Sequence, residues 1–200
     1  MTNYFNKAAL VATVAAIAFA ATPALASPTS VSADGTATVK IFSPLTIAAP
    51  TASDAIVDFG ILVGTLGGAS ARTSNSFVID ASTAPTAASV CTGAVNWSCS
   101  GSPHRALYTI TGSVDSSVNV WVSAASIDLL RSGGLITDPD DVVPLSLALS
   151  QTADSNGDGT ADVVLALGTA DVYVGGALGV SSTDRDGVYT GTFTVNADYQ

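Results

Sequence analysis

The sequence predicts an all-β protein built as an antiparallel β-sandwich, and three observations support this prediction. All 16 acidic residues are Asp, so Glu, a long charged residue that favours helices, is missing. Val, Thr and Ser are abundant, and 18 Gly supply turns, which is typical of short strands joined by tight connections. No segment after Ser27 has a convincing 3.6-residue hydrophobic period. At 200 residues, the chain is long enough to form one domain with a sizeable core.

Short alternating segments separated by Gly, Pro, Asp and Ser predict the individual strands. We expect strands over residues 36–42, 45–49, 55–59, 75–79, 106–112, 117–124, 143–150, 162–167, 171–174 and 188–199. Short strands with turn signals between them favour an immunoglobulin-like sandwich, either complete by itself or completed by a donor strand from a neighbouring subunit. The stretch 81–103 has the least pattern, and we expect a long loop there.

The first 26 residues have the pattern of a secretory signal peptide. Lys7 precedes an apolar run of about 14 residues, which is short of the roughly 20 needed to span a bilayer. Ala24 and Ala26 form a small-x-small cleavage site. We therefore expect an extension over 27–42 and a sandwich domain over 43–200, secreted through the periplasm to the cell surface without a membrane span. An oxidising destination also predicts a disulfide between the two cysteines, Cys91 and Cys99.

Net charge and residue types argue against several functions. Six basic residues against 16 acidic ones give a net charge of −10, which disfavours nucleic acid as a partner. A catalytic triad would have to use the single histidine, His104, which lies in the unpatterned stretch. Paired carboxylates could hydrolyse glycosides, but the Asp cluster at 138–141 is more simply a turn. We expect no enzyme and no catalytic residue.

The segment DSNGDGTAD, residues 154–162, has the spacing of a calcium-binding loop. The candidate ligands are Asp154, Asn156, Asp158, the carbonyl of Thr160, and Asp162. Leu165 stands where a Glu closes the site in an EF-hand. Alternating apolar residues on both sides predict that the segment connects two antiparallel strands. Two interpretations stay open, a weak structural calcium site and a solvated polar turn.

Both ends of the mature chain alternate between two faces, as strands do. In the closing segment one face carries Tyr189, Gly191, Phe193, Val195, Ala197 and Tyr199. Near the start, one face carries Val31, Ala33, Gly35, Ala37, Val39 and Ile41. Tyr199 is the penultimate residue, and Gly187 is fourteenth from the end.

This closing strand resembles the terminal signature of chaperone-usher pilus subunits. Over most of its mature length, the chain is also similar to the secreted bacterial family of domain of unknown function 4402. The matching pieces are ATVKIFSPLTI, VDFGILV, LYTITGS, DVYVGGALGV and GVYTGTFTVNADY. The resemblance implies a pilin-like or spore-coat-U-type domain and gives no reason to expect catalysis.

The resemblance further implies assembly into a filament by donor-strand complementation, helped by a periplasmic chaperone and an outer-membrane usher. A sandwich that lacks one strand exposes edge amides and apolar surface, which an extended segment of a neighbour covers. The donor side chains would be Val31, Ala37, Val39 and Ile41, and the terminal strand would use Gly187, Tyr189, Phe193, Val195 and Tyr199. The alternative is a free-standing, calcium-stabilised module that binds a glycan or a protein. Trp97, Trp121 and Tyr108 could stack on a sugar, although Trp121 could equally belong to the core.

Overall fold

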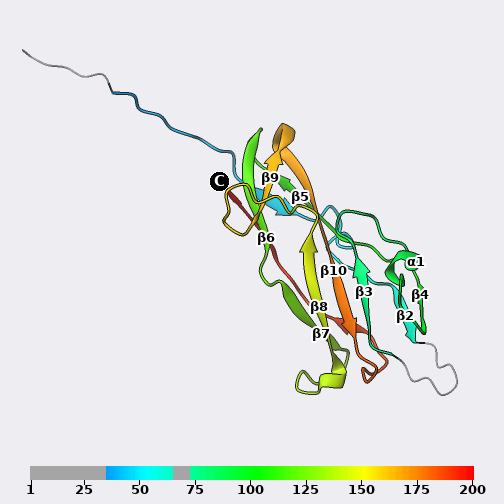
Figure 1. Cartoon of the computed structure of the whole chain (residues 1–200). Coiled ribbons are helices and arrows are strands. Elements are labelled where there is room, and N and C mark those ends of the chain that lie inside the picture. The colour runs from blue at the N-terminus through cyan, green and yellow to red at the C-terminus, as the bar shows by residue number, and fades with distance from the viewer. Residues whose placement is uncertain (1–34, 65–72) are drawn as a thin grey trace, which may run out of the picture. The chain divides into compact units, whose positions relative to one another are not determined.

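The computed structural model describes residues 35–64 and 73–200, and it confirms the predicted antiparallel β-sandwich (Figure 1). Residues Lys40–Gln200 form one compact unit. Its elements are β1 (Thr46–Ala48), β2 (Ile61–Gly64), β3 (Asn75–Ile79), α1 (Ala87–Val90), β4 (Trp97–Ser100), β5 (Ala106–Thr111), β6 (Ser116–Val122), β7 (Ser126–Arg131), the 3-10 turn η1 (Pro139–Asp141), β8 (Val142–Leu149), β9 (Ala161–Leu165), the 3-10 turn η2 (Ala166–Gly168), β10 (Thr169–Val180), β11 (Tyr189–Thr190) and β12 (Val195–Tyr199).

The largest sheet is organised around the long strand β10. Its order is β1-β5-β10-β8-β7-β11, and β3 also pairs with β10. Along one edge of β10 the partner changes from β5 to β3, while β8 pairs along the other edge. The change falls at Gly175 and Gly176. A Cβ atom at Gly175 would collide with the Ile79 carbonyl, and one at Gly176 would collide with the Ser146 carbonyl, so glycine permits this close approach.

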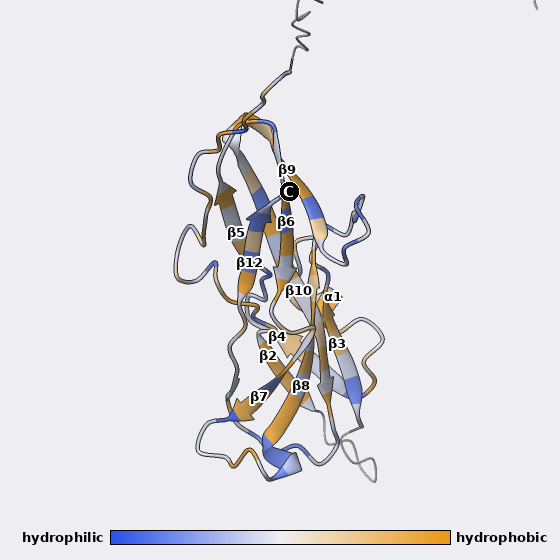
Figure 2. Cartoon of the chain, turned by 90° about the vertical axis from the view of Figure 1, so that its left-hand side faces the viewer, coloured by the Kyte–Doolittle hydropathy of each residue, from blue (hydrophilic) through white to orange (hydrophobic). Residues whose placement is uncertain are grey.

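A three-stranded sheet of order β12-β6-β9 and a β2-β4 pair complete the sandwich. Both hydrophobic and polar residues occur along individual strands (Figure 2). The first core lies between the three-stranded sheet and the β5-β10 half of the large sheet. Its buried residues are Ala106, Ile110, Val118, Val120, Val163, Leu165, Val172, Val174 and Val195. The second core lies between the other half of the large sheet and the segment that contains β2, α1 and β4. Its buried residues are Phe59, Phe77, Ile79, Val90, Val143, Leu145 and Leu178.

Two paired segments cross from one sheet to the other. β6 pairs with β12 in the three-stranded sheet, and β7 pairs with β11 in the large sheet. At the crossing, the Ser123 N–H donates to the Thr194 carbonyl at 2.9 Å. The single strand predicted over 188–199 is therefore two strands, because Tyr189 packs against the second core and Val195 belongs to the first.

Several predicted strands are confirmed with close bounds, namely β1, β3, β5, β6, β8 and β9. The strand predicted over 171–174 is much longer, because its partners continue on both sides as β3 and β8. The strands predicted over 36–42 and 55–59 are wrong. Residues 35–45 contain no strand, and 55–59 contributes only a bridge between Asp58 and His104. The predicted loop over 81–103 contains α1 and β4, and the sequence prediction also missed β2 and β7.

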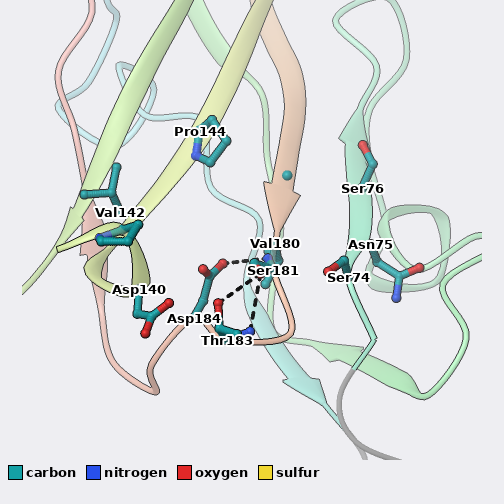
Figure 3. Close-up of a pocket in the computed structure, with 12 residues that line it drawn as sticks. Ser74, Asn75, Ser76, Asp140, Val142, Pro144, Val180, Ser181, Thr183 and Asp184 are labelled. Carbon is teal, nitrogen blue, oxygen red and sulfur yellow. Dashed lines mark hydrogen bonds between the residues drawn. The ribbon is translucent and has the colours of Figure 1, made fainter.

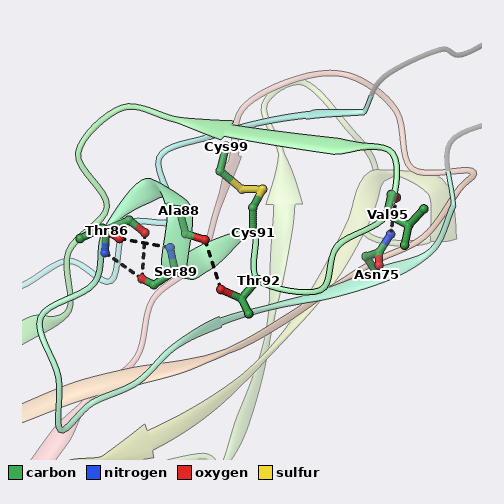
Figure 4. Close-up of a disulfide and its surroundings, with 8 residues drawn as sticks. All are labelled: Asn75, Thr86, Ala88, Ser89, Cys91, Thr92, Val95 and Cys99. Carbon is green, nitrogen blue, oxygen red and sulfur yellow. Dashed lines mark hydrogen bonds between the residues drawn. A yellow bond between two sulfur atoms is a disulfide. The ribbon is translucent and has the colours of Figure 1, made fainter.

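The Cys91–Cys99 disulfide is present, as predicted, and joins the end of α1 to β4 (Figure 4). A capping box starts this short helix: the Ser89 N–H donates to the Thr86 hydroxyl at 3.1 Å, and the Thr86 N–H donates to the Ser89 hydroxyl at 2.8 Å. Beside the disulfide, the Trp97 ring meets the fully buried Phe77 ring edge-on, with centroids 5.1 Å apart. The disulfide thus holds the segment that contains α1 and β4 against the second core.

A buried carboxylate, Asp141, joins two loops at the end of the sandwich that contains η1. Only 2% of Asp141 is exposed. It accepts from Arg131 Nε at 2.6 Å and from the Leu135 N–H at 3.0 Å, and Arg185 Nη1 lies 3.0 Å away. The hydrogen bond from Arg131 is the largest cause that holds the Asp141 pKa well below its usual range.

This network predicts an acid-sensitive contribution to stability. Because the pKa of Asp141 is lower in the folded chain, its stabilisation is present above about pH 4 and is lost as the pH falls further. Asp141→Asn should lower the melting temperature at neutral pH and make the loss of stability in acid shallower. Thermal melts across acidic pH test this, with Asp128→Asn, an exposed carboxylate on β7, as the control. Identical acid profiles for Asp141→Asn and the parent protein would contradict it.

Candidate functional site

Two strands, β1 and β12, each lie at an open edge of their sheet. Among residues 35–64 and 73–200, no ladder joins β1 to β12. The bonds from Ser123 N–H to Thr194 and from Gln200 N–H to Ser117 fix which backbone groups of β12 face β6. By alternation, the backbone N–H and C=O groups of Val195, Ala197 and Tyr199 face the open edge. This edge is the kind of surface to which another strand can add.

Tyr199 ties the segment before β1 to the end of β12. Its hydroxyl donates to the Ser43 carbonyl at 2.8 Å and accepts from the Ser113 N–H at 2.7 Å. Its ring stacks on Phe42 with centroids 4.4 Å apart. Gly112 leaves room for this hydroxyl, because a Cβ atom there would collide with it. The sequence singled out Tyr199, but no local pattern marked its partners Ser43 and Ser113.

Most residues of the predicted terminal face are directed at the cores. Val195 is 8% exposed, and Phe193, Ala197 and Tyr199 pack against the first core. Phe193 also meets Tyr108 edge-on at 6.4 Å. Tyr189 packs against the second core, whereas Gly187 lies outside the strands, beside the Arg131 side chain. These residues stabilise the strand whose other side is the open edge.

The predicted donor residues lie in an exposed segment. Ala37 is exposed, Val39 is 82% exposed and Ile41 is 86% exposed, while Val31 lies outside the described residues. Within residues 35–45, no position belongs to a strand. The alternating apolar side chains at 39 and 41 are therefore uncovered in the single chain.

The acidic loop is not the turn of a β-hairpin, contrary to the prediction that it connects two antiparallel strands. β8 belongs to the large sheet and β9 to the three-stranded sheet, so residues 150–160 cross from one sheet to the other. Alternation before and after the loop shows that each strand buries one face, but it does not show which sheet each strand joins.

The carboxylates of this loop accept hydrogen bonds from the protein itself. Asp154 accepts from the N–H groups of Gly157 at 2.6 Å and Gly159 at 2.9 Å. Asp158 accepts from the Thr160 side chain and N–H, and the bond from the Thr160 hydroxyl is the largest cause lowering the Asp158 pKa. Asp162 accepts from Ser155 and from Gln200. The carboxylates therefore act as caps for the turns of the loop.

The same arrangement does not present a ready-made cation cage. Across the described parts of the chain, no group of three or more His, Cys, Asp or Glu residues is placed to hold a metal ion. Calcium binding by Asp154, Asn156, Asp158, Asp162 and the Thr160 carbonyl would require the side-chain oxygens of this set to exchange hydrogen bonds for metal contacts. Calcium binding stays a prediction of the sequence.

Melting experiments distinguish the roles of this loop. Asp154→Ala should destabilise the protein by about 1 kcal/mol even in a chelator, because two glycine amides lose their acceptor. If calcium binds, millimolar calcium should raise the melting temperature of the parent protein but not of Asp158→Ala. Asp128→Ala is the control for removing an exposed carboxylate elsewhere. No calcium-dependent shift in the parent would exclude the calcium site, and an unchanged Asp154→Ala would contradict the capping role.

An open cleft of about 550 Å³ lies between the ends of β3, β8 and β10 (Figure 3). Its polar groups bond to one another: the Ser181 N–H donates to Asp184 at 2.7 Å, and the Thr183 N–H donates to the Ser181 hydroxyl at 3.3 Å. Asp184 is 7% exposed. These bonds shape the turn after β10, so we assign this cleft a structural role.

The chain belongs to the family described as Domain of unknown function (DUF4402), whose model matches residues 58–199. This match confirms the family resemblance that the sequence motifs indicated. Comparisons with curated proteins and with solved structures give no match. In the described ranges, no helix is long and apolar enough to cross a membrane.

Proposed function

We propose that this protein is a secreted structural subunit that assembles into a filament by donor-strand complementation. Residues 31–41 of one copy would add as a strand to the open edge of β12 in the next copy. The observation that supports this most is the exposure of Val39 and Ile41 in a chain whose sandwich also has an open edge at β12.

The physical reason is that both surfaces are unfavourable in water when left uncovered. Unpaired edge amides invite another strand, and exposed aliphatic side chains gain free energy on burial. At about 3.3 Å per residue, an 11-residue segment extends about 36 Å, long enough to run along the whole of β12. A donor and an acceptor at different surfaces make a heterologous contact, which continues as a filament.

Export and assisted assembly follow from the same proposal. A leader with the pattern of a signal peptide and a disulfide both suit an oxidising, extracytoplasmic compartment. Before assembly, the uncovered edge and segment would need protection from aggregation. A periplasmic chaperone and an outer-membrane usher, which the likeness to pilus subunits implies, would supply it.

Charge substitutions in the exposed segment test this assembly. Val39→Asp/Ile41→Asp should convert oligomers of the mature protein into monomers, because two charges would have to be buried at the acceptor edge. Thr36→Asp/Thr38→Asp adds the same charge at positions of opposite parity and should assemble much better. Size-exclusion chromatography with light scattering measures the outcome, and melting curves check that both variants fold.

Deletion of residues 31–41 is the stronger form of the same experiment. It should leave a monomeric sandwich. Oligomers of unchanged size in the deletion, or equal effects of the two charge pairs, would contradict donor-strand assembly.

A further inference from the structure

A second cleft, of about 450 Å³, opens on the side of the three-stranded sheet away from β12. The cleft exists because β9 begins at Ala161, opposite Val120, so on the β9 side of β6 no described strand pairs with Trp121 and Val122. By the alternation along β6, the backbone N–H and C=O of Val122 face this gap. The gap is bounded on its other side by Leu149 at the end of β8 and by residues 151–160.

The lining combines an apolar surface with neutral polar groups. Val122, Leu149 and Trp121 are half-buried, whereas Gln151 and Thr152 are exposed at the rim. Among the described residues, the Trp121 indole N–H has no protein acceptor, so it stays available as a donor. A concave site with an aromatic ring, apolar walls and a few hydrogen-bonding groups is typical of small-ligand sites, and its volume lies in their usual range.

Charge decides which class of ligand fits. Of the described residues that line the cleft, Asp154 alone carries a carboxylate, and it already accepts hydrogen bonds from loop amides. No Lys or Arg among the described residues lines the cleft, and a chain of net charge −10 repels anions. A sugar ring has an apolar C–H face that can stack on an indole and hydroxyl groups that can bond to amides and hydroxyls.

We propose that this cleft binds a neutral sugar residue of a glycan, with Trp121 stacking on the ring and with Gln151 and Thr152 bonding to its hydroxyls. The proposal does not depend on filament assembly. The open edge at β12 lies on one side of β6, and the cleft lies on the other side, next to the start of β9. A donor strand at β12 would therefore leave the cleft free. In the part of the chain that the structure describes, the cleft between β3, β8 and β10 has no aromatic residue in its lining.

Titration calorimetry of the mature protein tests this site. The probes are neutral cello-, malto-, manno-, xylo- and chito-oligosaccharides at millimolar concentration, with galacturonate oligosaccharides as the acidic comparison. We expect at least one neutral series to bind and the acidic series not to bind. Trp121→Ala should weaken binding about tenfold or more. Trp97→Phe, which alters the tryptophan of the second core, should leave the affinity unchanged.

Gln151→Ala keeps the test valid if Trp121→Ala folds poorly, because Gln151 is exposed at the rim. It should reduce affinity with an unchanged melting temperature. The monomeric Val39→Asp/Ile41→Asp variant should bind like the parent, which separates this site from assembly. Absence of binding by every neutral series, binding of the acidic series alone, or parent-like affinity in both cleft variants would overturn the proposal.

Discussion

The close approach of three strands to β10 is the constraint on which the large sheet depends. β10 supplies Val172 and Val174 to the first core and Leu178 to the second, so it joins the two halves of the sandwich. The exchange of β5 for β3 along one edge requires backbone atoms to come close at Gly175 and Gly176, where a Cβ atom would collide with carbonyl oxygens. Any larger residue there would push apart strands that contribute to both cores.

The sheets that enclose the first core end at different strands. The large sheet ends at β1, and the three-stranded sheet ends at β12 on one side and at β9 on the other. Tyr199 links the β1 side to β12 by contacts with Ser43 and Phe42 instead of by a strand ladder. The proposed assembly edge and the proposed sugar cleft thus both belong to the three-stranded sheet, which has fewer strands than the large sheet that it covers.

The sequence predicted local features well and long-range ones poorly. Alternation identified β3, β8 and the inward face of β12, because each strand buries one side. It failed for β2, whose Ile61 and Val63 are 61% and 50% exposed, so apolar residues there do not mark the buried face. It also failed at 36–42, where strand composition exists without a partner strand among the described residues.

The candidate sites also combine local features, which the sequence predicted, with long-range contacts, which it did not. The spacing of residues 154–162 identified a structured acidic loop, but hydrogen bonds from Asn119 and Gln200 to its carboxylates depend on strands far along the chain. The Asp141 network joins Arg131 to Arg185 across loops that no sequence pattern relates. The cleft at Trp121 arises from where β9 begins, which depends on sheet register and could not be predicted from local composition.

Residue-resolved hydrogen exchange of β12, compared between assembled protein and the monomeric Val39→Asp/Ile41→Asp variant, tests whether a donor strand adds to the open edge of β12. In the monomer, the amides of Val195, Ala197 and Tyr199 should exchange faster than those of Asn196 and Asp198, which face β6. Assembly should slow the first group strongly and the second group little, because only the first gains partners from a donor strand. Unchanged exchange at Val195, Ala197 and Tyr199 in the assembled protein would contradict donor-strand addition at this edge.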